Sequence, residues 1–503
     1  MTSQLRFRRL RRVGTAASGV VVLALLAGGL LAAEKWQAPA GEELDARGVA
    51  VAPGDVTMVC PGPPRLATEA AGEDLGYDEF DPEGSGTQSR LDAVSLSRAE
   101  DRAGEAWLAS DGGEEAALTA VGEERRGAIA PLVDSGALRA APAGEVTALV
   151  AGTTAALTED GDLRGLAAAR CLLPDTSAAF VAGSTETGDS AQLVLTNLGA
   201  TAATVTLEAW GATGPVDTSA LGSVLVAPHS QQVVLLEAAA PGQSRLALQL
   251  RATGGEVAAH LQISHLDGLT PGGTDLLTPE SPAAAEQVLP GVAWGEGAGE
   301  GSTLRLFNPG EEVLEASVEL LGDSEVVAVP GAESVAVDPG TVADVSLAGL
   351  PAGEWAVRVR ANDPVAAAAL IERGNDGAGR DRMWIAATPA LARATYVLPQ
   401  ELAEAATLHL ANPGDSAASA RIRVITSDGG SDLREVEVGA ERTATIAFSD
   451  LVDVLEVDAE GEGIHSGVVL TAGGGELSTW LAPTPDPHEV RAVNLAPRAP
   501  GLG

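Results

Sequence analysis

Two histidines, His260 and His265, are the residues whose type and spacing come closest to a metal site. Imidazole is a common zinc ligand, and two such rings on one surface would supply half of a tetrahedral site. An odd spacing on a β-strand, however, directs the two rings to opposite faces of the sheet. Sharing a metal ion would require a bulge between them, so we interpret both as ordinary strand residues. The sequence therefore predicts no metal site and no cofactor.

Carboxylates are the other groups that could catalyse a reaction, and the chain has 70 Asp and Glu residues. A glycoside hydrolase uses two facing carboxylates, but in so acidic a chain no single pair stands out. The segment 69–90 is rich in acidic residues and glycine, and calcium binds several carboxylate oxygens at once. It lacks the spacing of an EF-hand loop, so we predict a solvated acidic loop.

The sequence contains none of the short motifs that mark common catalytic classes. There is no Gly-x-Ser-x-Gly, no His-Glu-x-x-His and no glycine-rich phosphate loop. The 31 basic and 70 acidic residues give a net charge of −39, and such a surface repels nucleic-acid phosphates. We therefore expect a protein without enzymatic activity and without a nucleic-acid partner.

Two tryptophans, Trp384 and Trp480, stand out because aromatic residues make up only 3% of the chain. Each lies four residues before the threonine of a Thr-Pro pair, where the corresponding earlier position is Thr274. A carbohydrate-binding protein would expose such rings as platforms for sugars. Because so few aromatic residues are available for the core, we predict that both pack inside a sandwich or at a joint between domains.

The element that must position these residues is a strand–turn–strand unit that occurs three times. Strands of alternating apolar and polar residues flank each turn. Proline and then glycine at the centre are typical of a type II turn, in which glycine adopts a positive φ. The asparagine side chain is expected to bond to the backbone that follows it. The turns are Asn197-Leu-Gly199, Asn308-Pro309-Gly310 and Asn412-Pro413-Gly414.

Two further dipeptides recur in register with this turn. A Leu-Pro opens each unit at 173–174, 289–290 and 398–399, and a Thr-Pro closes it at 278–279, 388–389 and 484–485. A period near 100 residues is too long for a solenoid and typical of tandem β-sandwiches. We therefore predict an all-β chain with three tandem immunoglobulin-like sandwiches of about seven strands, preceded by an N-terminal β module. The predicted bounds are 55–172 for the module and 173–288, 289–397 and 398–503 for the sandwiches.

The N-terminal end has the pattern of a membrane anchor. Five arginines in residues 1–12 precede an apolar run at 13–33. At about 1.5 Å per residue, a helix of that length spans the hydrocarbon core. The arginines would hold the N-terminus in the cytoplasm, residues 34–54 would form a tether, and the bulk of the chain would be extracellular. The alternative is a cleaved signal peptide, but the apolar run is long for one, so we favour a single-pass anchor in the cell membrane.

Cys60 and Cys171 are the two cysteines of the chain. Export would place them in an oxidising compartment, and we predict a disulfide between them. A bridge that closes a loop of about 110 residues could contribute about 4 kcal/mol of stability. Two buried thiols are the alternative. A metal site is disfavoured because no histidine or second cysteine lies near either residue in the sequence.

The layout resembles an uncharacterised actinobacterial family of exported, membrane-anchored, β-rich proteins, known only as a domain of unknown function. The resemblance rests on the Arg-rich anchor, the Cys-Pro-Gly-Pro at 60–63, the segment around Cys171 and the Leu-x-Leu-x-Asn-Pro-Gly strands. These motifs are structural. The resemblance therefore implies an envelope location and a β architecture, and it carries over no catalytic residue.

Three functions follow from these patterns. The leading one is a non-enzymatic, membrane-tethered envelope protein whose sandwiches act as spacers or as binding modules for an envelope protein or a cell-wall polymer. The first alternative is an envelope glycan hydrolase or transferase that uses carboxylates in an interdomain cleft. Buried carboxyl groups with raised pKa values in such a cleft would favour it. The second alternative is a calcium-stiffened adhesin.

Overall fold

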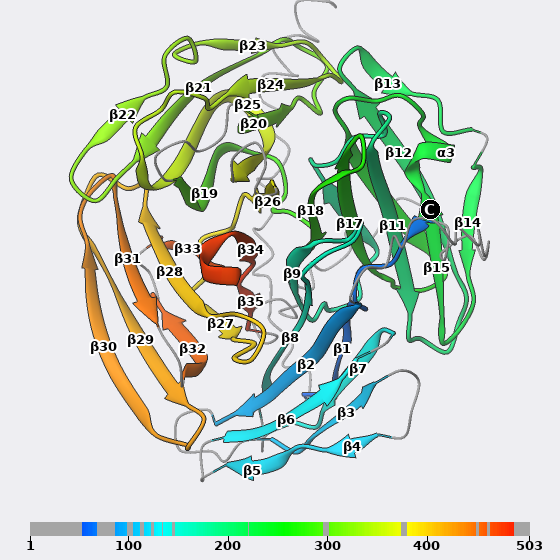
Figure 1. The fold of residues 1–503 in the computed structure, drawn as a ribbon, viewed down its shortest axis with the longest axis vertical. Helices are drawn as coiled ribbons and strands as arrows, with labels where there is room; N and C mark the ends of the chain where they lie inside the picture. The colour runs from blue at the N-terminus through cyan, green and yellow to red at the C-terminus, as the bar shows by residue number, and fades with distance from the viewer. Residues whose placement is uncertain are drawn as a thin grey trace, which may run out of the picture. The chain divides into compact units, whose positions relative to one another are not determined.

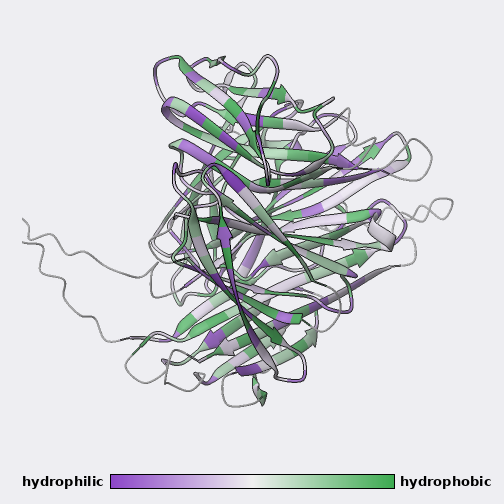
Figure 2. Cartoon of the chain, turned by 90° about the vertical axis from the view of Figure 1, so that its left-hand side faces the viewer, coloured by the Kyte–Doolittle hydropathy of each residue, from purple (hydrophilic) through white to green (hydrophobic). Residues whose placement is uncertain are grey.

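Alternation of apolar and polar residues along the strands builds the fold. In β12 (Ala203–Gly211), Val205 and Leu207 are buried, while Glu208 is exposed and Thr206 is on the same outer face. Successive side chains of a strand point to opposite faces, so this pattern gives a sheet with one face on a core. Figure 2 shows hydrophilic (purple) and hydrophobic (green) residues alternating along many strands.

The computed structural model describes most of the chain between residues 53 and 486. The described residues are 53–67, 86–97, 104–110, 115–121, 125–132, 134–142, 146–219, 221–294, 301–373, 380–448, 452–459 and 463–486. Nearly all elements in these ranges are strands, so the all-β prediction is confirmed. Within these ranges no helix is long and apolar enough to cross a membrane. The predicted anchor at 13–33 and most of the acidic loop at 69–90 lie outside the described residues.

Each predicted sandwich contains two antiparallel sheets connected in the same order (Figure 1). In the first sandwich, one sheet has the order β10-β16-β12-β13, with β14 also on β12, and the other has the order β15-β11-β17-β18. Their bounds are Ser177–Phe180 for β10, Ala247–Thr253 for β16, Gly214–Val216 for β13, Ser223–Val226 for β14, Ser230–Leu235 for β15, Asp189–Asn197 for β11, Ala258–Asp267 for β17 and Thr270–Leu277 for β18. The one-turn helix α3 (Leu236–Ala239) follows β15.

In the second sandwich, the long strand β25 (Gly353–Arg373) belongs to both sheets, since its first half pairs with β19 and β21 and its second half with β20 and β26. The other strands are β19 (Ala284–Trp294), β20 (Thr303–Phe307), β21 (Leu314–Leu321), β22 (Val326–Ala328), β23 (Val335–Val337), β24 (Val342–Ser346) and β26 (Asp381–Ala386). The third sandwich has β27 (Arg393–Val397), β28 (Ala405–Asn412), β29 (Ala418–Thr426), β30 (Ser431–Val438), β31 (Arg442–Phe448), β32 (Val452–Asp458), β33 (His465–Ala472), β34 (Leu477–Leu481) and β35 (Thr484–Pro485).

Two predicted boundaries differ from the sheets. Residue 289 falls inside β19, and β27 lies before residue 398 although it pairs with β32 of the third sandwich. A Leu-Pro was expected to open each unit, but Pro290 lies within β19 at a register shift in its pairing with β25. Proline lacks a backbone donor and is tolerated in a strand at such irregularities. The landmark therefore marks a strand irregularity in this unit rather than a domain edge.

The N-terminal module repeats the strand order of the sandwiches. Its sheets are β1-β7-β3-β4 and β5-β6-β2-β8-β9, so the described part of the chain contains four units with this connection pattern. The bounds are β1 (Val56–Cys60), β2 (Thr87–Leu96), β3 (Ala106–Ser110), β4 (Ala116–Ala117), β5 (Thr119–Val121), β6 (Arg125–Pro131), β7 (Gly136–Ala140), β8 (Leu149–Thr158) and β9 (Gly165–Arg170). The repeated turn and the two dipeptides occur in only three of these units, because the N-terminal module lacks them.

The last strands of the four units pack on one another. Strand β9 contacts β18, β18 contacts β26, β26 contacts β34, and β34 contacts β9 again. Backbones come close enough to require glycine: a Cβ on Gly165 would lie 2.9 Å from the amide nitrogen of Thr274, and one on Gly273 would lie 2.5 Å from that of Arg382. Residues 52–491 accordingly form one compact unit, in which the first and last β units are in contact.

The three asparagine turns hold two loops of each sandwich together. Asn308 is buried, and its amide donates to the carbonyls of Glu312 (2.8 Å) and Val337 (2.9 Å) while its Oδ1 accepts from the Gly310 amide (2.8 Å). Asn197 and Asn412 make equivalent bonds: each Oδ1 accepts from the glycine amide at 199 or 414, and each amide donates to the carbonyl of Thr201 or Ser416. Each amide also donates to the carbonyl of the residue that ends a later strand, Val226 of β14 or Val438 of β30. The predicted side-chain bond to the following backbone is present.

The type II assignment of these turns is wrong. None of Gly199, Gly310 and Gly414 has a positive φ. Glycine is favoured for another reason: a Cβ at these positions would lie 3.0–3.1 Å from the asparagine Oδ1 that accepts the glycine amide, which is a crowded contact. The side chain of the asparagine, rather than the backbone angle of the glycine, sets the residue type.

Replacing Asn412 with alanine is expected to lower the free energy of unfolding by about 3 kcal/mol, because buried backbone groups lose their partners at a cost of about 1–3 kcal/mol each. Thermal unfolding of the full chain measures the effect. Pro413→Leu is the matched control, since Leu198 occupies the equivalent position in the first turn. A melting temperature for Asn412→Ala equal to that of the control would contradict the structural role of the asparagine.

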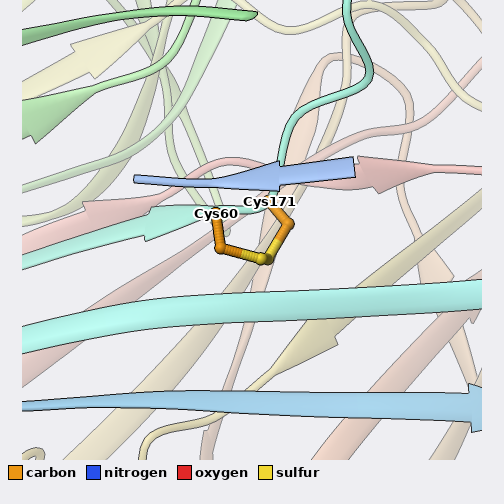
Figure 3. Close-up of a disulfide and its surroundings, with 2 residues drawn as sticks. All are labelled: Cys60 and Cys171. Atoms are coloured by element: carbon orange, nitrogen blue, oxygen red, sulfur yellow. A yellow bond between two sulfur atoms is a disulfide. The ribbon is translucent and has the colours of Figure 1, made fainter. Parts of the chain in front are cut away.

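The predicted disulfide is confirmed. Cys60, the last residue of β1, is bonded to Cys171, which follows β9, and both residues are fully buried (Figure 3). Beside it, Val59 and Leu172 exchange backbone hydrogen bonds of 2.8 and 2.7 Å. The bridge therefore joins the first strand of the N-terminal module to the segment that enters the first sandwich.

Candidate functional site

A cavity of 410 Å³ lies where the β units meet and is called the junction cavity below. Its wall includes β10, the segment 279–283 that links the first two sandwiches, and Phe307, Pro309 and Pro485. Most lining side chains are apolar. A concave, mostly apolar site of about 300–1,000 Å³ with a few polar groups is typical of small-molecule binding, so the junction cavity is the first candidate.

Three ionisable side chains line this cavity, and two of them, Arg170 and Glu280, make no ion pair with a described residue. The third, Asp175, is exposed, and its Oδ1 accepts hydrogen bonds from the amides of Thr176 and Ser177. For Arg170, no hydrogen bond or ion pair of the guanidinium is found among the described residues, and its Nε is enclosed. Burial lowers the pKa of Arg170 to about 10, so the group stays protonated at neutral pH. For Glu280, Oε1 accepts from the Val181 amide at 2.7 Å, while Oε2 is enclosed and has no partner in the described chain. Burial raises the pKa of Glu280 to about 8, so the carboxyl is largely neutral at pH 7.

A second cavity, of 210 Å³ and called the polar cavity below, lies between the first and second sandwiches. Most of its charged side chains are already paired. Arg305 binds Asp344 through two hydrogen bonds of 2.9 and 3.1 Å, and His265 contacts Asp189 at 2.6 Å. Arg382 lies 3.8 Å from Asp189. The polar cavity therefore offers a ligand fewer unsatisfied charges than the junction cavity does.

The Asp189–His265 pair is the arrangement closest to a catalytic dyad. A serine or cysteine nucleophile would have to approach the second ring nitrogen of the histidine. In the described chain, no such hydroxyl or thiol hydrogen-bonds to that nitrogen. The His265 ring and the neighbouring Arg382 hold down the pKa of Asp189 against its burial, giving a value below the usual range. The pair therefore acts as a link between neighbouring strands.

Two buried aspartates lie where the last strands of the sandwiches pack together. Asp275 accepts hydrogen bonds from the amides of Leu276 and Trp384 and from the Thr479 hydroxyl, all at 2.9 Å. Asp381 accepts from the Ser478 amide at 2.6 Å and from its hydroxyl at 3.2 Å. Burial raises the pKa of Asp275 to about 8 and that of Asp381 to about 7. These carboxyls bind backbone donors of adjacent units, so they join strands.

The raised pKa values predict that stability falls as pH rises. In the unfolded chain the pKa of an aspartate lies near its ordinary value of 3.8, and in the folded chain the pKa of Asp381 is about 7. Between these values the folded chain holds a proton that the unfolded chain has lost, so each pH unit costs about 1.4 kcal/mol per group. We expect the melting temperature to decline between about pH 4 and pH 7. Asp381→Asn should flatten the decline, and an unchanged slope would argue against a protonated Asp381.

The other candidate residues from the sequence are structural. His260 is buried, and desolvation lowers its pKa to about 4. In the described ranges no group of three metal-ligating side chains is positioned to bind an ion. Trp384 and Trp480 are each only 6% exposed, so neither can serve as an open sugar platform. The Arg305 guanidinium covers the Trp384 ring at 5.0 Å, and Trp480 donates to the Pro290 carbonyl at 2.9 Å.

Sequence reasoning did not identify Arg170, Glu280 or the aspartates as a group. The only available signal was that Arg170, Pro279, Pro309 and Pro485 lie in or beside repeated landmarks. These landmarks are far apart in the chain and meet only after the four units pack together.

Comparisons with known proteins give a family but no activity. The model of a family of unknown function (DUF5719) matches residues 121–449. No match was found among curated proteins. The chain is similar to the solved structure of Thermotoga maritima 1070, with 17% identity, a TM-score of 0.19, and coverage of 21% of this chain and 93% of that one.

Further similarity is to the α-L-rhamnosidase of Streptomyces avermitilis complexed with L-rhamnose. The identity is 10%, the TM-score is 0.13, and the coverage is 78% of this chain and 55% of that one. TM-scores this low support no argument about fold or function.

Proposed function

Because the chain belongs to the family of unknown function DUF5719, we propose a function from its own geometry: it is a non-enzymatic, membrane-tethered binding protein of the cell envelope. The tether is the apolar run at 13–33, and the extracellular part is the β-rich body. The actinobacterial source and the export are part of the same proposal.

The observation that carries this proposal is the contrast between the buried carboxyls and the junction cavity. Asp275 and Asp381 bind backbone and hydroxyl donors of adjacent strands, whereas Arg170 at the cavity has no partner among the described residues. A spacer needs extended domains, but here the N-terminal module contacts the third sandwich, as in the ion pair of 2.7 Å between Arg125 and Asp453. Packing of this kind supports a binding body over a linear spacer.

The alternative of an envelope glycan hydrolase or transferase is favoured by one observation, namely that Asp275 has a raised pKa and lines the polar cavity. The alternative of a calcium-stiffened adhesin depends on the acidic loop 69–90. Chelation that lowers the melting temperature of the full chain would support the adhesin and count against the leading proposal.

The proposal is tested on intact cells and on the purified full chain. External protease should digest the body in intact cells, N-terminal sequencing should recover the arginine-rich tail, and crosslinking in cells should capture a reproducible envelope partner or ligand. The full chain should release no sugar from cell-wall glycan. Release that Asp275→Asn abolishes without lowering the melting temperature would replace this proposal by the hydrolase.

A further inference from the structure

We propose that the junction cavity binds an amphiphilic anion, with its apolar body against the cavity wall and its carboxylate or phosphate group on the Arg170 guanidinium. This inference rests on the proposed binding function and specifies the ligand class. It is carried by an unpaired arginine at a cavity that is otherwise mostly apolar.

Buried arginines elsewhere in the described chain show what Arg170 lacks. Arg358 is 1% exposed and contacts Glu319 at 2.6 Å and Glu441 at 2.8 Å. Arg90 contacts Asp92 at 2.6 Å. Arg170 is half-buried with an enclosed Nε, and a charge withdrawn from water is costly unless it is paired. An arginine that avoids every described carboxylate of a chain with 70 acidic residues is therefore best explained by an anion that arrives from outside.

The second polar group of the cavity fits the same ligand. The Glu280 side chain is anchored by the Val181 amide through Oε1, which leaves Oε2 free of partners in the described chain. A protonated carboxyl can donate one hydrogen bond, and an anionic oxygen is the strongest acceptor for it. Arg170 and Glu280 together would supply charge and one further donor to a single head group.

The rest of the wall fits an apolar body. Leu172, Val181, Leu248, Phe307, Pro309 and Pro485 line the cavity, and they come from the N-terminal module and all three sandwiches. A purely inorganic anion would leave the apolar cavity wall in contact with water, and a neutral hydrocarbon would leave Arg170 unpaired. The combination favours a ligand with one apolar part and one acidic group.

The test uses the full chain in lipid nanodiscs and a decanoate probe that carries a terminal diazirine. After irradiation, mass spectrometry should locate the label on peptides from β10 and from 279–283. Unlabelled decanoate or decyl phosphate should compete, and these two competitors distinguish a carboxylate from a phosphate preference. Decanol should compete poorly because it cannot pair with Arg170. Equal competition by decanol would overturn the role of the charge.

Two variants separate binding from folding. Arg170→Leu should reduce labelling of these peptides by about tenfold or more, the loss of one charge-assisted contact, while the melting temperature without ligand stays equal or rises. Arg251→Gln, an exposed arginine on β16, is the matched control and should label like the unmodified chain. Arg170→Leu that labels normally, or that melts at a lower temperature, would refute the proposal and indicate a structural arginine.

A truncated chain provides a further test, because residues 487–503 follow in the sequence soon after Pro485 of the cavity wall. A chain ending at Asp486 that labels many-fold more strongly than the full chain would assign the cavity to that segment and overturn the external ligand. Failure of labelling leaves the location and partner experiments on cells unaffected. The ligand class and the proposed function can therefore fail separately.

Discussion

Trp480→Ala is expected to lower the free energy of unfolding by about 3–5 kcal/mol, the usual cost of truncating a buried tryptophan. The ring belongs to β34 of the third sandwich, yet it lies in the apolar cluster of the second, among Leu289, Val292 and Met383. Its Nε1 also donates to the Pro290 carbonyl. The substitution removes both apolar packing and a hydrogen bond, so the contact between the second and third sandwiches should weaken.

Thermal unfolding and limited proteolysis of the full chain measure this loss. Trp480→Phe is the matched control, since it keeps most of the apolar contact and removes only the hydrogen bond, at about 1 kcal/mol. Cleavage of Trp480→Ala should begin between the second and third sandwiches. A variant with unchanged stability and weakened glycan binding would instead restore the carbohydrate interpretation of the two tryptophans.

The tryptophans show how far the sequence could predict the joints. Their position before the Thr-Pro and the scarcity of aromatic residues were enough to predict burial, which the 6% exposure of each confirms. The direction of insertion was not predictable. Trp384 packs with the apolar cluster of the first sandwich and Trp480 with that of the second, and such contacts between distant segments leave no periodicity in the sequence.

For the asparagine turns, the sequence predicted the role of the asparagine correctly but the backbone geometry of the turn incorrectly. Alternation and the repeated Asn-x-Gly were sufficient to place β11, β20 and β28 and to predict a side-chain bond to the backbone. The type II prediction failed because turn rules assume a positive φ at the glycine, whereas here glycine avoids a crowded contact between a Cβ and the asparagine Oδ1. Rules that consider only the turn residues cannot include a hydrogen bond to a distant carbonyl, such as the one that the buried Asn197 amide donates to Val226.

The strand order of the N-terminal module and the junction cavity could not be predicted from the sequence for a related reason. The N-terminal module shares the strand order of the sandwiches but none of their repeated turns and dipeptides, so the sequence predicted a β module there without showing that it resembles the sandwiches. Strand order depends on which segments pair, and many different sequences fold with the same strand order. Arg170 became informative only when the structure showed that no described carboxylate reaches it.

Removing the disulfide is the other change with a large expected effect. The two cysteines are 111 residues apart, and the loss of loop-closure entropy predicts a cost of about 4–5 kcal/mol for a loop of this length. We expect the full chain to melt at a clearly lower temperature after reduction. The N-terminal module should open first, because the bridge holds β1 to the segment after β9.

The double substitution Cys60→Ala and Cys171→Ala provides the control, since its melting temperature should not respond to a reducing agent. Gly152→Ala gives an independent check. A Cβ at residue 152 would lie 2.6 Å from the Cys171 sulfur and 3.2 Å from the Asp92 carbonyl oxygen, so the bridge and an alanine compete for one space. Gly152→Ala should therefore destabilise the oxidised chain more than the double-alanine chain. Equal losses in both backgrounds would show that the backbone contact, and not the sulfur, requires glycine there.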